Sequence, residues 1–221
     1  MNKSQLVKEY LESLFKEPKC ELNFGNDFEL LVAVILSAQC TDKRVNIVTE
    51  ELFKDFKTPH DFLNISQEEL EQKIRPCGFY KNKAKAIIET SKDLVQKFDG
   101  QLPKTREELQ TLRGVGRKTA NVVLSVLYDY PAIAVDTHVF RVSNRLGLSN
   151  SKDVTKCEND LMKVFKKEDW SKMHYLLVLF GRYFCKAIKP QCQECKLKQV
   201  CLYYNNKKEG KDVLRQSENN N

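Results

Sequence analysis

The chain has 221 residues, 41% of them hydrophobic and 30% charged, enough for one large or two small domains with buried cores. Lys and Arg outnumber Asp and Glu by 37 to 30, and the formal net charge of +7 favours a polyanionic partner. The longest apolar run, Leu30 to Leu36, is far shorter than the roughly 20 residues that span a bilayer. The charged N-terminus is unlike a secretory signal, so we expect a soluble, cytoplasmic protein without a membrane partner.

Hydrophobic spacing predicts an all-α fold, because no sustained alternation of apolar and polar residues indicates a strand. If residues 28–39 form a helix, almost every face of it is apolar. This is typical of a helix buried on every side at the centre of a domain. In residues 45–56 and 84–95 the apolar positions recur three to four apart, so each segment is expected to form a helix with one buried face.

Two capping boxes predict where further helices begin. Ser66 is followed three residues later by Glu69, and Thr105 by Glu108, a pattern in which each side chain satisfies a free backbone N–H of the first turn. We therefore expect helices to begin near residues 67 and 106.

Three later apolar series predict more helices, at residues 139–146, 154–165 and 173–184. The last part of the chain, residues 205–221, has few apolar residues and predicts a disordered tail.

Four of the eight cysteines crowd the C-terminal part of the chain, with six, two and five residues between them. Four thiolates in one short loop can close around a single metal centre, either a tetrahedral zinc ion or a cubane iron–sulfur cluster. A single CxxC with outlying cysteines favours the cluster without deciding between the two. The candidate ligands are Cys185, Cys192, Cys195 and Cys201.

A short glycine turn is predicted to join two helices in "LRGVGRKTANVV", the first ending near Leu112 and the second beginning near Arg117. Gly114 and Gly116 would permit positive φ and close approach of the backbone. The N–H groups of the turn and the positive end of the second helix then form an anion site, suited to a nucleic-acid phosphate. A plain helix–helix connection would look the same, so the turn alone does not decide the function.

Two residues near this turn are candidates for chemistry. Lys118 lies in the first turn of the second helix, where the helix dipole and Arg117 disfavour its positive charge and so favour the nucleophilic free amine. Asp136, in "IAVDTHVFRV", is either a helix N-cap or a carboxylate in an apolar rim that stabilises positive charge on a sugar ring. His138 is expected to be a structural hydrogen-bonding residue.

These motifs together resemble the endonuclease III family, the bifunctional DNA glycosylases of the helix-hairpin-helix superfamily. The resemblance rests on the glycine turn, the Asp136 segment, "LLVAVILSAQCTD" and the C-x6-C-x2-C-x5-C run, in this order, and it spans about residues 21 to 203. It implies a six-helix barrel domain over residues 21–130, with the helix-hairpin-helix at about 105–129. A second domain of residues 1–20 plus 131–204 would carry a [4Fe–4S] cluster, and the two would flank a DNA-binding groove.

The resemblance also implies the activity. The protein would remove oxidised or otherwise damaged pyrimidines from duplex DNA and cleave the abasic site by β-elimination, as a monomer associated with the nucleoid. Lys118 would be the nucleophile and Asp136 the essential carboxylate. The hairpin residues Gly114, Val115 and Gly116 would bind DNA, and the four clustered cysteines would hold the [4Fe–4S] cluster.

Gln39 resembles the family's wedge residue, the side chain that fills the space left by a flipped base. Phe79 stands where a bulky aliphatic wedge is usual, and is equally well read as a core aromatic. Arg113 replaces the proline usual before the first hairpin glycine, which predicts a less rigid turn, and Cys40 replaces a small residue that is not a thiol.

Two alternatives remain at this point. One is a sister branch that removes adenine opposite oxidised guanine, but that branch lacks a lysine at the position of Lys118. The other is a non-catalytic helix-hairpin-helix DNA-binding module with a structural zinc ion, which would have no need of both Lys118 and Asp136.

Overall fold

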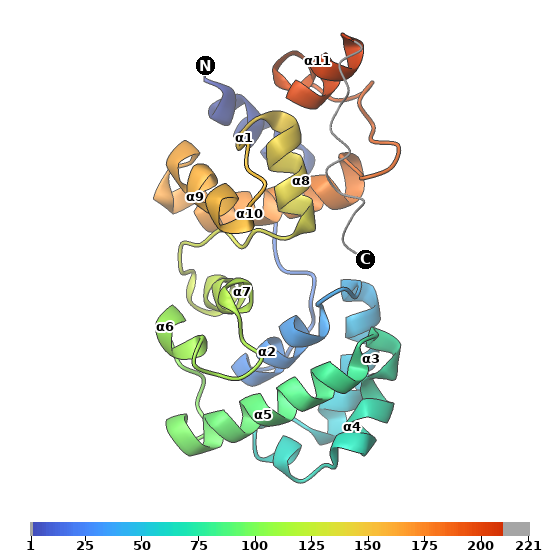
Figure 1. Cartoon of the computed structure of the whole chain (residues 1–221), viewed down its shortest axis with the longest axis vertical. Helices are drawn as coiled ribbons and strands as arrows, with labels where there is room; N and C mark the ends of the chain where they lie inside the picture. Colours follow the sequence, from blue (N-terminus) through green and yellow to red (C-terminus); the bar gives the residue numbers. More distant parts are fainter. Residues whose placement is uncertain (1, 210–221) are drawn as a thin grey trace. The chain divides into compact units, whose positions relative to one another are not determined.

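The structure, a computed structural model, describes residues 2–209, and the regular secondary structure of those residues is helical throughout, which confirms the predicted all-α class (Figure 1). The chain divides into two compact units. One is Cys20–Tyr130, and the other combines the chain up to Lys19 with the chain from Pro131. No helix among the described residues is long and apolar enough to cross a membrane.

The unit Cys20–Tyr130 is built around the first of its helices, α2. Every residue of α2 from Phe28 to Leu36 is buried, and the helix packs against α3, α5 and α7, so the prediction of a helix buried on every side is confirmed. The elements of this unit are α2 (Asp27–Leu36), α3 (Asp42–Asp55), the 3-10 turn Asp61–Leu63, α4 (Gln67–Ile74), the 3-10 turn Arg75–Cys77, α5 (Tyr80–Phe98), α6 (Arg106–Leu109) and α7 (Arg117–Tyr128).

The end of α2 differs from the prediction, because the helix ends at Leu36 and not at Gln39. The hydroxyl of Ser37 donates to the Val34 carbonyl oxygen at 2.8 Å. Gln39 then takes a left-handed backbone with φ of 52°, which cannot continue a right-handed helix. Gln39 therefore lies in the turn between α2 and α3.

At both predicted capping boxes the Ser or Thr side chain caps the start of a helix. The side chains of Ser66 and Thr105 accept hydrogen bonds from the backbone N–H groups of Glu69 and Glu108, at 3.1 and 3.2 Å. Helix α4 begins at Gln67 and helix α6 at Arg106, each directly after its capping residue and at the predicted position. Helix α6 ends at Leu109, earlier than the predicted end near residue 112, because a turn with a bond from the Leu112 N–H to the Leu109 carbonyl follows it.

The second unit has its own core, to which α1, α8, α9 and α10 contribute buried side chains. The three predicted later helices are present as α8, α9 and α10. Helix α11 includes Asn205 and extends to Lys208, so helical structure continues past the predicted start of the tail; residues 210–221 of that tail lie outside the described residues. The elements are α1 (Lys3–Leu14), α8 (Thr137–Leu146), α9 (Val154–Val164), the 3-10 turn Lys167–Asp169, α10 (Trp170–Leu179), the π-helical turn Phe180–Phe184, the 3-10 turn Lys198–Val200 and α11 (Leu202–Lys208).

Candidate functional site

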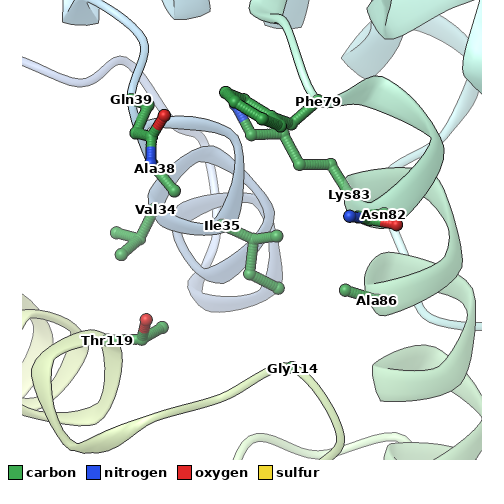
Figure 2. A pocket seen from close by; sticks show the side chains of 10 residues that line it. All are labelled: Val34, Ile35, Ala38, Gln39, Phe79, Asn82, Lys83, Ala86, Gly114 and Thr119. Carbon is green, nitrogen blue, oxygen red and sulfur yellow. The ribbon is translucent and has the colours of Figure 1, made fainter. Parts of the chain in front are cut away.

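A pocket of about 280 Å³ lies in the unit Cys20–Tyr130, where the end of α2, the start of α5, the glycine turn and the start of α7 meet (Figure 2). Gln39 and Phe79 project from two separate loops at one end of it. Phe79 is 62% exposed, so its interpretation as a core aromatic is wrong. The lining residues are Val34, Ile35, Ala38, Gln39, Phe79, Asn82, Lys83, Ala86, Gly114 and Thr119.

The two rim residues share an uncommon backbone conformation. Gln39 has φ of 52° and Phe79 has φ of 45°, in the left-handed region that residues with a Cβ enter at a cost of about 1–2 kcal/mol each. Such conformations persist only where the surrounding structure imposes them, and they concentrate at functional sites. Both rim positions therefore combine a strained backbone with a place at the edge of the pocket.

A buried lysine lies against the same pocket. Lys83 is 5% exposed, and its Nζ donates to the carbonyl oxygens of Leu36 and Cys77, both at 2.9 Å. Burial lowers the pKa of Lys83, and the charges of the Cys40 and Cys77 thiols oppose that shift. Sequence reasoning did not single out Lys83. The available signal was its position four residues before the buried Ile87, which puts a lysine on an apolar helix face.

The two hairpin glycines play different structural roles. Gly114 has φ of 83°, and a Cβ added there would lie 2.8 Å from the Cβ of Ala86 on α5. Gly116 has φ of −88° and open space around it, and it is the N-cap of α7. The predicted need for positive φ and close approach therefore holds at Gly114 alone. Val115 between them is buried and anchors the turn in the core.

Helix α5 holds the backbone of the turn at Arg113. The Arg113 N–H donates to the Asp93 carboxylate at 2.9 Å, and the Thr90 hydroxyl donates to the Arg113 carbonyl oxygen. Asp93 also pairs with Lys97 at 2.7 Å, and the Arg113 guanidinium lies 3.5 Å from Glu89. A proline at 113 has no N–H to give Asp93. The predicted loss of rigidity at Arg113 is therefore offset by a bond that proline could not form.

The bonds at Asp93 also set its ionisation. Burial alone would raise the pKa of this carboxyl, but the hydrogen bonds from Lys97 and from the Arg113 N–H outweigh burial and hold the pKa below its usual range. Asp93 is only 7% exposed and is therefore an ionised group within the protein. Its negative charge fastens the hairpin to α5.

Lys118 lies in the first turn of α7 with an exposed side chain. The next residue, Thr119, lines the pocket. The N–H groups in the first turn of a helix point along its axis and carry the positive end of the helix dipole, which attracts anions. The turn, the helix start and the pocket with Gln39 thus belong to one continuous region of this unit.

Asp136 belongs to the other unit, where it caps α8. Its Oδ1 accepts a hydrogen bond from the Val139 N–H at 2.7 Å, which confirms the N-cap interpretation. Residues 132–135 before it are buried, so the half-exposed carboxylate follows an apolar segment. Burial lowers the pKa of His138 although the charge of Asp136 opposes the shift, and Arg141 lies 3.2 Å from its Nδ1. These contacts agree with a structural role for His138.

The loop with the four clustered cysteines packs against α8. Arg145 donates to the Cys185 sulfur at 3.6 Å and to the Lys186 carbonyl at 2.7 Å, and the Cys201 thiol donates to the Arg145 carbonyl at 3.3 Å. Burial raises the pKa of Cys195 to about 11, with a further rise from the charges of the other three thiols. Among the described residues no group of three or more His, Cys, Asp or Glu side chains is arranged to hold a metal ion. The loop thus gathers four thiols without a closed set of ligands.

The sequence from residue 32 to 167 matches the HhH-GPD superfamily of base excision DNA repair proteins. The endonuclease III of Bacillus subtilis is 53% identical over 189 residues, which cover 85% of this chain and 86% of that protein. The endonuclease III of Haemophilus influenzae is 46% identical over 206 residues, which cover 92% of this chain and 97% of that protein.

Solved structures are similar along nearly the whole chain. A trapped covalent intermediate of endonuclease III with DNA has a TM-score of 0.89 and 48% sequence identity, covering 94% of this chain and 99% of that chain. A thermostable thymine-DNA glycosylase has a TM-score of 0.81 at 20% identity, covering 92% of this chain and 97% of that chain, a likeness of fold alone.

Proposed function

The chain belongs to the HhH-GPD superfamily of base excision DNA repair proteins, and from this we propose that it excises damaged pyrimidines through Lys118 and Asp136. The protein is a DNA glycosylase and abasic-site lyase that binds DNA. A DNA-binding module without catalysis and an adenine-specific mismatch glycosylase are not favoured, since the similar proteins are endonuclease III enzymes.

One observation carries the proposal, namely that the exposed Lys118 directly precedes Thr119, which lines a pocket with two strained rim residues. A glycosylase must take the damaged base out of the duplex, at a cost of a few kcal/mol that is lower for a poorly stacked lesion. We assign the filling of the vacated space to Gln39 and Phe79, because the strain of both loops and the exposure of Phe79 suit side chains that insert into DNA. The turn at Gly114 would grip the phosphates beside them.

The proposed chemistry uses the side-chain nitrogen of Lys118 as the nucleophile. Its Nζ forms a bond to C1′ of the sugar while the base departs with the electrons of the glycosidic bond. The carboxylate of Asp136 stabilises the positive charge that develops on the sugar. Ring opening gives a Schiff base, which acidifies the C2′ protons. Loss of one of them expels the 3′ phosphate and cuts the strand. All these residues lie in one chain, so a monomer suffices.

A [4Fe–4S] cluster is the group proposed for the C-terminal loop. The donor set suits it, since four thiols lie in one loop packed against α8, with the guanidinium of Arg145 beside Cys185. When bound, the cluster would brace this loop as a structural centre. A broad absorbance near roughly 410 nm is expected from the purified protein. A colourless protein with one zinc ion would refute the assignment. The proposed ligands are Cys185, Cys192, Cys195 and Cys201.

Borohydride trapping tests the catalytic assignment. Reduction of the Schiff base should link the protein covalently to duplex DNA that bears an oxidised pyrimidine or an abasic site. Lys118→Ala should abolish the linkage, whereas Lys92→Ala, which changes an exposed lysine of α5, should leave it unchanged. Trapping of Lys118→Ala at the level of the unaltered protein would exclude Lys118 as the nucleophile.

A further inference from the structure

A single buried ammonium group joins the two loops that form the rim of the pocket. The Nζ of Lys83 donates to the carbonyl oxygens of Leu36 and Cys77, at 2.9 Å each. Leu36 precedes Gln39 by three residues, and Cys77 precedes Phe79 by two. Figure 2 shows the Lys83 side chain running from α5 beside Phe79. The two rim loops are therefore tied to one side chain.

The amino group of Lys83 lies where burial is costly, with only 5% of the residue exposed. Burial of an ammonium group requires compensation, which here comes from carbonyl groups at the C-terminal ends of two helical segments, where the backbone is partly negative. Helix α2 has no basic residue in its own last turn, so Lys83 supplies this cation from α5. An apolar side chain of similar length would fill the same space without the cost of desolvation. Packing alone therefore does not account for a lysine.

The bonds of Lys83 act next to the strained residues. Gln39 and Phe79 hold left-handed conformations although neither is glycine, and such conformations require fixed flanking backbone. Gly78, directly before Phe79, also has a positive φ, of 67°. Lys83 fixes one carbonyl three residues before Gln39 and another two residues before Phe79.

We propose that Lys83 is a positioning residue for base extrusion, whose ammonium group holds the Gln39 and Phe79 loops ready to fill the space that a flipped base leaves. This inference rests on the proposed glycosylase function and on the assignment of the two rim side chains. It assigns Lys83 no contact with DNA. Its effect should therefore depend on whether the damaged base is paired.

The test compares one lesion in two settings. Single-turnover excision of an oxidised pyrimidine is measured in a fully paired duplex and in a single-nucleotide bulge, where no base pair has to be broken. Each rate is divided by the fraction of protein that borohydride traps on abasic DNA, so that partial unfolding of a variant cancels. The quantity of interest is the ratio of the paired rate to the bulge rate.

Lys83→Met should lower this ratio about tenfold, since two buried hydrogen bonds are lost on the loops that support flipping. Lys83→Arg, which keeps the charge and the donors, should stay within about threefold of the unaltered protein. Lys92→Met, at an exposed position on the same helix, should leave the ratio unchanged. A role in stability alone would leave both normalised rates, and therefore their ratio, unchanged. An unchanged ratio for Lys83→Met thus overturns the proposal.

A second variant covers the case in which Lys83→Met leaves no protein that can be trapped. Lys83→Gln has a side chain one atom shorter and uncharged, with an amide that can donate to one of the two carbonyls. It should lower the ratio about threefold, and an unchanged ratio again overturns the proposal. Failure of the unaltered protein to be trapped would instead refute the catalytic assignment of Lys118.

Discussion

Substitution of Gly114 by alanine should destabilise the unit Cys20–Tyr130 far more than substitution of Gly116. Both glycines belong to the same short turn, and both substitutions add one methyl group. At Gly114 the backbone has φ of 83°, and the new Cβ would lie 2.8 Å from the Cβ of Ala86. At Gly116 the backbone is extended and nothing lies within 4 Å of the added atom. The pair therefore isolates strain and steric overlap from the general effect of losing a glycine.

The magnitude follows from three contributions at Gly114. A left-handed alanine costs about 1–2 kcal/mol, and the overlap with α5 costs about 1–3 kcal/mol. The reduced freedom of the unfolded chain returns about 0.4–1 kcal/mol. The free energy of unfolding should thus fall by roughly 2–4 kcal/mol. Gly116→Ala should change it by less than about 1 kcal/mol, because the same entropic return offsets the poorer N-cap preference of alanine.

Equilibrium urea unfolding of the two variants measures the difference. Ala86→Gly offers a further check, because it removes the atom that the new Cβ would strike. The double variant should be less destabilised than the sum of the two single changes by about 1–3 kcal/mol. If Gly114→Ala costs no more than Gly116→Ala, or if the two changes at 86 and 114 simply add, the close packing of the turn on α5 is not what requires glycine.

Two further predictions concern the residues around this turn. Because the folded pKa of Asp93 is depressed, the stability it contributes is present above the unfolded pKa of about 3.9 and is lost as pH falls through the folded pKa. Asp93→Asn should therefore be about 1 kcal/mol less stable at neutral pH, and in acid unfolding the difference should vanish once the pH falls below the folded pKa of Asp93. A difference independent of pH would contradict the ionised bond. Phe79→Ala should change the free energy of unfolding by no more than about 0.5 kcal/mol from that of the unaltered protein, since the residue is 62% exposed. The same variant should excise paired lesions more slowly. A larger loss of stability would show that the ring is part of the core.

Local sequence determined much of the secondary structure. The apolar run of α2 and the capping boxes at Ser66 and Thr105 depend on neighbours within four residues, so they could be identified before any tertiary contact was known. The cysteine spacing and the glycine turn with Lys118 were recognisable for the same reason. The end of α2 was misplaced because the apolar spacing carries no sign of the left-handed conformation at Gln39.

The proposed roles of the rim and hairpin residues depend on contacts that the sequence does not contain. Whether Phe79 is core or rim was decided by its exposure, and the requirement for glycine at 114 by the approach of Ala86. Lys83 and Asp93 looked like ordinary polar residues of an amphipathic helix, since their partners lie up to 47 residues away along the chain.

The sequence by itself determined the helices, the glycine turn and the resemblance to a repair family, because each depends on neighbouring residues or on fixed spacings between residues. The tertiary structure alone decided that one helix, α5, serves both the pocket and the turn. Its residues at 83, 86, 90 and 93 recur three to four apart, and so lie along one face. Folding brings the partners of that face to it. The contacts are hydrogen bonds to backbone carbonyls, one from a backbone N–H, and the close approach of Gly114, and none of them leaves a pattern in the local sequence.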